Sequence, residues 1–290
     1  MVCGAAGRLG SAMPAAFAGW HVVTHTHATL DVTSAPAVRA AMHDAAPDVV
    51  INCVAFNDVD RAETEFAEAL ALNASAVRTL GRAAEDRGAM FVQFGTDFVF
   101  DGTARTPYSE EARPSPRSTY AITKLLGDWF ALDTAHGFVL RVESLFGGPT
   151  ASPRRRGSID TIVDRLEQGT DVTVFSDRVV SPSFVDDVAR ATRHLVESDA
   201  APGVYHCVNS GYATWCEVAE AAARMLGVVP RLRPVRLDEM TLRAARPKFC
   251  ALDNRKLAAA GFEMPTWQDA LQRWLAARAG RQDKISGIHG

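Results

Sequence analysis

Long apolar runs are missing from this 290-residue chain, and no stretch approaches the ~18 residues that a membrane-spanning helix requires. The N-terminus also lacks the charged region and the long apolar region of a secretory signal. A basic excess is absent too, because the formal net charge is -3, which leaves no basic surface for nucleic acid. These absences predict a cytoplasmic protein with small-molecule ligands and with neither a membrane nor a nucleic-acid partner.

Cysteine is scarce as well, and the five cysteines are odd in number and widely spaced. No Cys-x-x-Cys pair occurs, and no combination of cysteine with histidine has the spacing of a zinc site. We therefore expect neither a disulfide framework nor a zinc site built on these cysteines, and the set of site residues predicted below contains no metal ligand. The residues that we interpret as reduced, buried thiols are Cys3, Cys53, Cys207, Cys216 and Cys250.

What the chain does have is a regular alternation of short apolar runs with amphipathic stretches, as at 48–52, 65–87 and 90–94. Strands that are apolar throughout, separated by helices with polar faces, are typical of a parallel sheet covered on both sides. The sequence therefore predicts an α/β fold with a doubly wound parallel (Rossmann) sheet. Further expected strands are 20–24, 137–141 and 203–208, and further expected helices are 35–45, 120–132, 159–168, 185–197, 217–226 and 266–279.

The regular alternation of apolar runs with amphipathic stretches changes after Gly147-Gly148-Pro149. We expect a dinucleotide-binding domain at 1–148, completed by a late strand from about 180–208. The segments 149–179 and 209–280 are expected to form a smaller substrate-binding region, with loops at 152–157 and 177–182. The tail 281–290 lacks periodicity and is expected to fray.

A glycine-rich run, Gly4-Ala-Ala-Gly7-Arg-Leu-Gly10, stands at the start of the chain. Before a helix beginning near Leu9, such a run places backbone amides and a helix N-terminus against a pyrophosphate. A flexible tail is the alternative interpretation. Only 1–3 precede Gly4, so the first strand is expected to be unusually short, and a start a few residues upstream would also account for this.

Tyr120 and Lys124 stand four apart in Pro114-Ser-Pro-Arg-Ser-Thr-Tyr120-Ala-Ile-Thr-Lys124. On a helix these positions share a face, so the ammonium can stabilise the phenolate and reach a cofactor ribose. We expect the pKa of the Tyr120 phenol to be lowered towards neutral pH by this cation. Together with the glycine run, the pair predicts nicotinamide-dependent carbonyl reduction, with Tyr120 as the proton donor.

With these residues assembled, the chain resembles the extended short-chain dehydrogenase/reductase superfamily and, within it, the dTDP-4-dehydrorhamnose reductase family. The resemblance spans almost the whole chain. Its local marks are Leu30-Asp31-Val32-Thr33, Pro47-Asp48-Val-Val-Ile-Asn52, Val59-Asp60-Arg-Ala-Glu63, Leu72-Asn73-Ala74, Gly95-Thr96-Asp97-Phe98-Val-Phe-Asp101-Gly102, Ser181-Pro182-Ser183, Arg246-Pro247 and Ala251-Leu252-Asp253.

The resemblance implies a set of residues that hold NADP or NAD. The diphosphate would lie on the glycine run, the adenine would meet Asp31 and Val32, and Val54 and Ala55 would pass beneath the cofactor. Asp31 could instead cap a helix, Val54 and Ala55 could be core, and Asn73 could carry a hydrogen bond that bridges the sheet. The full expected set is Gly4, Gly7, Arg8, Leu9, Asp31, Val32, Val54, Ala55, Asn73, Tyr120 and Lys124.

The resemblance also implies that Thr96 completes the catalytic set with Tyr120 and Lys124. At the end of a predicted strand, its hydroxyl can hydrogen-bond the substrate carbonyl, although an ordinary strand threonine is the alternative. Sugar-nucleotide 4,6-dehydratases place Asp-Glu after this threonine, whereas Phe98 stands here in place of the Glu, which favours reduction over dehydration. The expected substrate residues are Asn57, Val59, Thr96, Asp97, Phe98, Ser144 and Arg246.

Two of these positions depart from the reductases of the family. Ser144 occupies the usual place of a substrate-facing Trp, and Phe98 that of a Tyr, so the sugar pocket is expected to differ. The preceding Glu143 adds a charge, which could simply pair with Arg141. Arg246 would lie near the substrate diphosphate or, alternatively, at an exposed helix end.

The function that this resemblance implies is an NAD(P)H-dependent reductase of a nucleotide-diphospho-4-keto-6-deoxysugar, and a homodimer is possible. Alternatives are a non-catalytic NADP-binding regulatory subunit of the methionine adenosyltransferase type and a nucleotide-sugar epimerase. No acidic residue stands at 22–27, where NAD-specific enzymes hold the ribose diol, so NADP is favoured. His25 or His27 could face a 2′-phosphate.

Overall fold

Short parallel strands form the central sheet of the molecule. A computed structural model describes residues 1–148 and 157–286, with side chains as far as residue 280. The sheet comprises β1 (Val2–Cys3), β2 (Thr24–His25), β3 (Val49–Asn52), β4 (Met90–Thr96), β5 (Gly137–Val142) and β10 (Gly203–His206). Within the described residues the strand order is β10-β5-β4-β3-β1-β2, and every neighbouring pair is parallel. The predicted α/β class with a doubly wound parallel sheet is confirmed.

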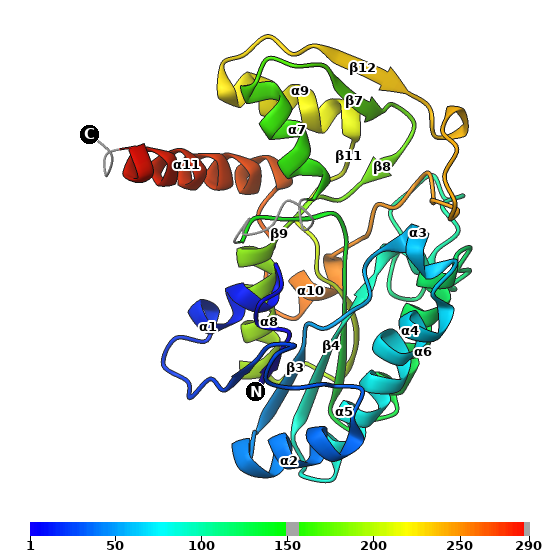
Figure 1. Cartoon of the computed structure of the whole chain (residues 1–290), viewed down its shortest axis with the longest axis vertical. Coiled ribbons are helices and arrows are strands. Elements are labelled where there is room, and N and C mark those ends of the chain that lie inside the picture. The colour runs from blue at the N-terminus through cyan, green and yellow to red at the C-terminus, as the bar shows by residue number, and fades with distance from the viewer. Residues whose placement is uncertain (149–156, 287–290) are drawn as a thin grey trace.

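Helices cover both faces of this sheet. They are α1 (Met13–Ala16), α2 (Ala35–Ala45), α3 (Val59–Ala62), α4 (Phe66–Leu70), α5 (Ala76–Glu85), α6 (Thr119–Leu132) and α8 (Val185–Glu197). Successive strand residues alternate between two cores: Val50 and Phe91 face residues of α2 and α5, whereas Ile51 and Val92 share a core with α8. Figure 1 accordingly shows α4, α5 and α6 on one side of β3 and β4, and α1 and α8 on the other.

The first strand is as short as the sequence predicts. Val2 pairs with β2 on one side and β3 on the other, so both edges of β1 are hydrogen-bonded. The amino group of Met1 donates to the carbonyl oxygen of Val49 at 2.7 Å, and its own carbonyl accepts from Ile51. Two paired residues therefore suffice to place the following Gly4 at the carboxyl edge of the sheet.

A second region lies above the carboxyl edge of the strands in Figure 1. It includes α7 (Ser158–Glu167), α9 (Trp215–Leu226), α10 (Arg255–Ala259) and α11 (Trp267–Ser286). Three short strand pairs join it: β7 (Val172–Phe175) with β12 (Leu232–Val235), β8 (Val179–Val180) with β11 (Ala213–Thr214), and β6 (Leu145–Phe146) with β9 (Ser183–Phe184). None of the helices in the described part of the chain is long and apolar enough to cross a membrane.

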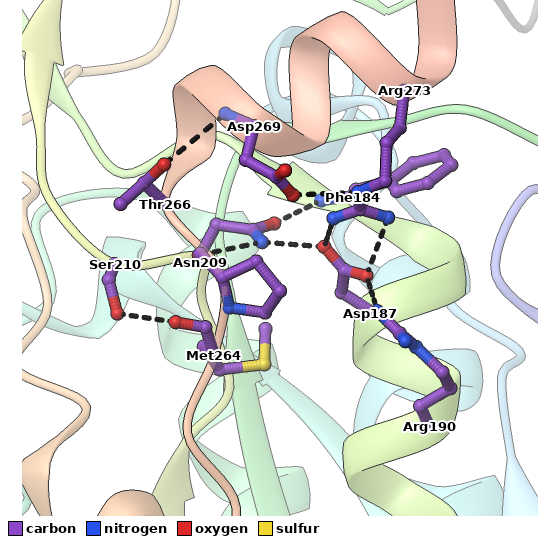
Figure 2. A network of polar contacts seen from close by, with 10 residues as sticks. Phe184, Asp187, Arg190, Asn209, Ser210, Met264, Thr266, Asp269 and Arg273 are labelled. Atoms are coloured by element: carbon purple, nitrogen blue, oxygen red, sulfur yellow. Dashed lines mark hydrogen bonds and ion pairs between the residues drawn. The ribbon is translucent and has the colours of Figure 1, made fainter.

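A buried carboxylate ties α8 to this second region (Figure 2). The fully buried Asp187 accepts from Arg273 of α11 at 2.7 Å, from Asn209 at 2.7 Å, and from Arg190 one turn along α8. Asn209 in turn accepts from the backbone N–H of Phe184 at 2.7 Å. One side chain thus connects three segments that are far apart in the sequence.

Three sequence expectations differ from the structure. The segment 177–182 is not only loop, because Val179 and Val180 form β8 against β11. The stretch 65–87 is helical from Phe66 to Glu85, but a π-helix at Ala71–Ser75 replaces the α-helical hydrogen bonding between α4 and α5. The helix α11 continues to Ser286 through Arg, Gln and Lys residues, which favour helix, and so enters the segment 281–290 that is expected to fray. The predicted loop at 152–157 lies outside the described residues, except for its last residue.

Candidate active site

The candidate site lies where the strands of the sheet end. In a parallel sheet the carboxyl ends of neighbouring strands meet at one edge, which is where ligands bind in doubly wound folds. Here β1 ends at Cys3 before Gly4, β3 ends at Asn52 before Cys53, and β4 ends at Thr96. The residues predicted from the sequence to bind the cofactor and to react therefore start from one edge.

The glycine run forms a turn that only glycine can make this tightly. Gly4 has φ +80°, in the left-handed region, and its carbonyl oxygen accepts from the N–H of Gly7 at 2.9 Å. A Cβ on Gly10 would overlap that same carbonyl oxygen. This close, side-chain-free backbone ahead of α1 fits the diphosphate cradle that the sequence predicts.

Arg8 and Leu9, between Gly7 and Gly10, have side chains that contact other parts of the protein. The Arg8 guanidinium donates to Asp160 of α7 at 2.6 Å and to the carbonyl oxygen of Gly147 at 2.8 Å. Leu9 is buried in the core. The Arg8 side chain therefore ties the turn to the second region, and contact with a diphosphate by 8 and 9 remains a prediction for their backbone.

Other predicted cofactor residues also have structural partners. A side-chain oxygen of Asp31 accepts from the N–H of Thr33 at 2.9 Å and from its hydroxyl at 2.6 Å, while Val32 packs in the core with α2. These contacts form a local turn, whereas the cap of α2 is Ser34 and not Asp31. Contact of Asp31 with the adenine remains a prediction. Val54 and Ala55 are half-buried beside the Gly4 turn, where a Cβ on Gly4 would touch Val54.

Asn73 bridges the site instead of reaching into it. Its amide oxygen accepts from the N–H of Phe56 at 2.8 Å, and its amide nitrogen donates to the Phe56 carbonyl and to the Thr123 hydroxyl, both at 3.1 Å. These bonds connect the loop after β3 to α6. The geometry matches the bridging alternative, and cofactor contact by Asn73 remains a prediction.

The proposed catalytic side chains are brought together by the start of α6. Ser118 caps this helix by accepting from the N–H of Ala121 at 3.3 Å, and the Glu63 carboxylate accepts from the N–H and the hydroxyl of Thr119 at 2.8 and 3.0 Å. Tyr120 and Lys124 then occupy successive turns, and both are buried, as is Thr96 at the end of β4. The hydroxyl of Thr96 is close enough to the phenol of Tyr120 to act on its pKa.

Burial has the largest effect on the pKa of both Tyr120 and Lys124. Desolvation raises the pKa of Tyr120, and the hydrogen bond from Thr96 only partly offsets this rise. Desolvation also lowers the pKa of Lys124 to about 8, although Asp128 and Cys53 oppose that shift. The expectation of a phenol with a lowered pKa is therefore wrong for the protein alone, because the cost of burying a phenolate is larger than the benefit of its polar neighbours.

Lys124 is held in place by a backbone carbonyl. Its Nζ donates to the carbonyl oxygen of Phe94 at 2.5 Å. One turn further along α6, Asp128 forms an ion pair with Arg141 of β5 at 3.1 Å. Among the described residues the ion pair of Arg141 is with Asp128 and not with Glu143, whose carboxylate accepts from the N–H of Ser181 at 2.6 Å.

The predicted substrate residues divide into two groups. Asp97 and Phe98 lie beside the catalytic set, with the rings of Phe98 and Tyr120 in edge-to-face contact at 5.6 Å. Ser144 is half-buried after β5 and has φ +46°, a strained conformation for a residue with a side chain.

The second group lies on the segments around α3. Val59 packs with Tyr120 and Phe98, and Asn57 is exposed. The Arg246 guanidinium is bound by Asp60 at 2.7 Å, so the exposed helix-end alternative is not what the structure has. Contact of these residues with a substrate remains a prediction.

Sequence reasoning missed Arg178 and the positioning role of Glu63. The guanidinium of Arg178 lies over the Phe98 ring, 5.2 Å from its centre, and is close to Asp97, Glu143 and Cys250. Glu63 belongs to the run 59–63, but nothing in its spacing predicts a hydrogen bond with Thr119 at the start of α6. Neither partner could be found without knowing which distant segments fold together.

A pocket of about 350 Å³ extends from Arg178 into the second region. Side chains of α7, β7 and α9 form its walls, and it is open to solvent. Its lining includes Thr161, Ile162, Arg165, Val174 and Trp215. Arg178 lines this pocket and also lies over the Phe98 ring, which contacts the ring of Tyr120.

A parallel sheet of this order, a glycine turn after its first strand and a buried Thr-Tyr-Lys set at its carboxyl edge define an extended short-chain dehydrogenase/reductase. The chain belongs to the RmlD substrate binding domain family, whose model matches residues 1–279.

Relatives of known name agree with this assignment. The dTDP-4-dehydrorhamnose reductase of Streptomyces griseus is 34% identical over 97% of this chain and 94% of its own length. The dTDP-4-keto-6-deoxy-D-glucose reductase of Streptomyces niveus is 34% identical over 93% of this chain and 94% of its own. Among solved structures, the Bacillus anthracis dTDP-4-dehydrorhamnose reductase in complex with NADP has a TM-score of 0.89, at 27% identity over 95% of this chain and 98% of that one.

Proposed function

We propose that this protein is an NAD(P)H-dependent reductase of a nucleotide-diphospho-4-keto-6-deoxysugar. The observation that carries the proposal is the buried set of Thr96, Tyr120 and Lys124 beside the glycine turn at the carboxyl edge of the sheet. Two relatives at 34% identity over nearly the whole chain are named as reductases of such keto-sugars. The solved relative in complex with NADP supports the choice of cofactor.

In the proposed reaction the reduced nicotinamide supplies a hydride to the ketone carbon. Thr96 orients the carbonyl oxygen, and the Tyr120 O–H bond breaks as its proton goes to the oxygen that becomes a hydroxyl. Because its pKa is raised, Tyr120 holds its proton at neutral pH and is ready as a donor. The Lys124 ammonium would stabilise the phenolate left behind and would hold the cofactor ribose.

The substrate is expected to extend from Tyr120 past Phe98 into the pocket beyond Arg178. A nucleoside diphosphate carries negative charge and an aromatic base, and the pocket offers Arg165 and Arg178 for the first and Trp215 for the second. Arg246 is less suited to the diphosphate, because its guanidinium is already paired with Asp60. Phe98 supplies an apolar wall beside the keto carbon.

Turnover with a chosen keto-sugar tests the proposal directly. The protein is mixed with NADPH or NADH and dTDP-4-keto-6-deoxyglucose or its 3,5-epimer, and the absorbance of the reduced nicotinamide is followed. A decay that requires the keto-sugar supports reduction. Sugar conversion without loss of the reduced cofactor would indicate an epimerase, and no reaction together with co-purification of a methionine adenosyltransferase would favour a regulatory subunit.

The preference for NADPH rests on the end of β2, where Thr24 and His25 stand and no carboxylate repels a 2′-phosphate. Comparing kcat/KM for the two cofactors in the same assay tests it. A homodimer and a cytoplasmic location belong to the proposal as well. Light scattering of the purified protein and fractionation of the producing cells are the corresponding measurements.

A further inference from the structure

Two carboxyl groups face each other next to the proposed catalytic hydroxyls. Asp97 follows Thr96 directly, and Glu143 follows β5; the residues are 3% and 2% exposed. Asp97 Oδ2 and Glu143 Oε1 are buried and have no hydrogen-bond partner among the described residues. Ligand atoms of the two carboxyl groups and of Cys250 all lie within 4.8 Å of one another. Two buried carboxyl groups this close, each with one unpartnered oxygen, call for a positive charge or a proton to balance their charge.

The charges around the pair determine what that is. Arg178 contributes one positive charge, and its Nη2 contacts Cys250 Sγ at 3.8 Å. Glu143 Oε2 accepts from the N–H of Ser181 at 2.6 Å. Two carboxylates with one guanidinium leave a net negative charge in a dry site, whereas one added proton makes the cluster neutral. Burial raises the pKa of both Asp97 and Glu143, in agreement with a retained proton.

Thr96 lies between the pair and Tyr120. Thr96 Oγ1 donates to Asp97 Oδ1 at 3.0 Å, and the same hydroxyl is close enough to the Tyr120 phenol to act on its pKa. A threonine hydroxyl both donates and accepts, so Thr96 can pass a proton between Asp97 and Tyr120. The result is a continuous chain of hydroxyl and carboxyl groups from Tyr120 through Thr96 and Asp97 towards Glu143.

We propose that Asp97 and Glu143 share one proton and that this pair is the store from which Tyr120 regains its proton after each turnover. The inference rests on the proposed reductase function. The phenolate takes the proton of the Thr96 hydroxyl, and Thr96 takes the proton held by Asp97. Only O–H bonds form and break, and no oxidant or reductant is involved. Solvent in the pocket lined by Arg178 then returns one proton to the pair.

The pH dependence follows from the groups that face the pair, which are Arg178, Cys250 and the hydroxyls of Thr96 and Tyr120. Below the raised apparent pKa of the pair, Asp97 and Glu143 hold the shared proton, and above that value they have lost it. Turnover in the wild type therefore falls as the pH rises through that value. Glu143 and Asp97 act through Tyr120 and are positioning residues in this scheme.

The test combines infrared spectroscopy with steady-state kinetics on the full chain. Infrared spectra of the wild type at neutral pH are compared with those of Glu143→Gln and Asp97→Asn, which keep shape but remove a carboxyl group. Glu110→Gln is the matched control, because Glu110 is another largely buried carboxyl group with a raised pKa, bonded to the N–H of His206. Circular dichroism and NADPH affinity verify that each variant is folded.

We expect a carboxylic-acid carbonyl band in the wild type and in the control, and its loss in both pair variants. With Glu143→Gln, kcat should fall at least about 10-fold while KM stays within about twofold, and the alkaline fall of kcat should disappear. Absence of a band that depends on Glu143 overturns the inference, and so does an unchanged kcat and pH profile in Glu143→Gln. If the wild type reduces no keto-sugar, the proposed function fails separately, and the infrared band alone then decides whether the pair holds a proton.

Discussion

At the scale of single residues, burial sets where protons lie in the site. Tyr120 keeps its proton because a buried phenolate is costly, and Lys124 gives up its proton more readily than a lysine in water does. A helical i, i+4 spacing is visible in a sequence, but the desolvation of its members is not. For that reason the placement of Tyr120 and Lys124 on successive turns of α6 was predictable, whereas the direction of the Tyr120 pKa shift was not.

Replacing Tyr120 by Phe should remove the proton donor and leave the fold intact. The ring still packs against Phe98, so the variant is expected to bind NADPH with wild-type affinity and to lose turnover at least ~100-fold. Loss of NADPH absorbance with keto-sugar is the measurement. Tyr212→Phe is the control, since Tyr212 is half-exposed and far along the chain from the catalytic set. Equal activity of Tyr120→Phe and wild type would remove Tyr120 from the mechanism.

The lowered pKa of Lys124 predicts a pH-dependent affinity for the cofactor. Below pH about 8 the side chain is charged, and above it the ammonium loses its proton and its attraction for the cofactor ribose and phosphates. We expect the NADPH Kd of the wild type to rise several-fold between pH about 7 and about 9.5. Fluorescence titration with Lys124→Met should give weaker binding without this rise, and a flat wild-type profile would contradict the assignment.

At the scale of elements, α6 can present its catalytic residues only because it lies very close to the π-helix at Ala71–Ser75. A Cβ on Gly127 would overlap the carbonyl oxygen of Asn73. The same approach allows Asn73 to reach Thr123 on α6. Helix bounds such as 185–197 were predictable from periodicity, but a π-helix has no comparable sequence signal, since its cause is this packing of one helix against another.

Gly127→Ala should therefore push α6 away from the π-helix and disturb the catalytic set. We expect the free energy of unfolding to fall by about 1–3 kcal/mol and kcat to fall with it, because Tyr120 and Lys124 move with the helix. Urea unfolding and NADPH turnover are the measurements. Gly280→Ala is the matched control: Gly280 is also helical, has open space around it, and should gain up to about 1 kcal/mol on substitution. Similar behaviour of the two variants would argue against the close approach.

At the scale of the whole molecule, the sequence was sufficient for the sheet and its ligand edge but not for the contacts between distant segments. Apolar strands, the glycine run and Thr96 at a strand end all follow from local pattern. The packing of the second region on the sheet brings Arg178 close to Asp97 and pairs Arg246 with Asp60. Such pairs depend on tertiary geometry, which one sequence without its fold does not specify.

The connection between the sheet and the second region should depend on the charge of Asp187. Burial opposes its ionisation, but hydrogen bonds from Arg273 and Asn209 outweigh this and lower the pKa of Asp187. Its contribution to stability is therefore present above the unfolded-state pKa of about 3.9 and is lost as the pH falls through the lower folded-state value.

Asp187→Asn is expected to lower the free energy of unfolding by about 2–3 kcal/mol at pH 7, because Asn cannot accept both guanidinium bonds in the buried position (Figure 2). The difference from the wild type should shrink as the pH falls below about 4, where the wild-type carboxylate is progressively protonated. Urea unfolding measured from pH 7 down to the acid limit tests both parts. Asp44→Asn is the control, since Asp44 is exposed and pairs with the neighbouring His43 at the surface; it should change stability by less than about 0.5 kcal/mol. A difference that persists unchanged at low pH would mean that the shape of Asp187, and not its charge, connects α8 to α11.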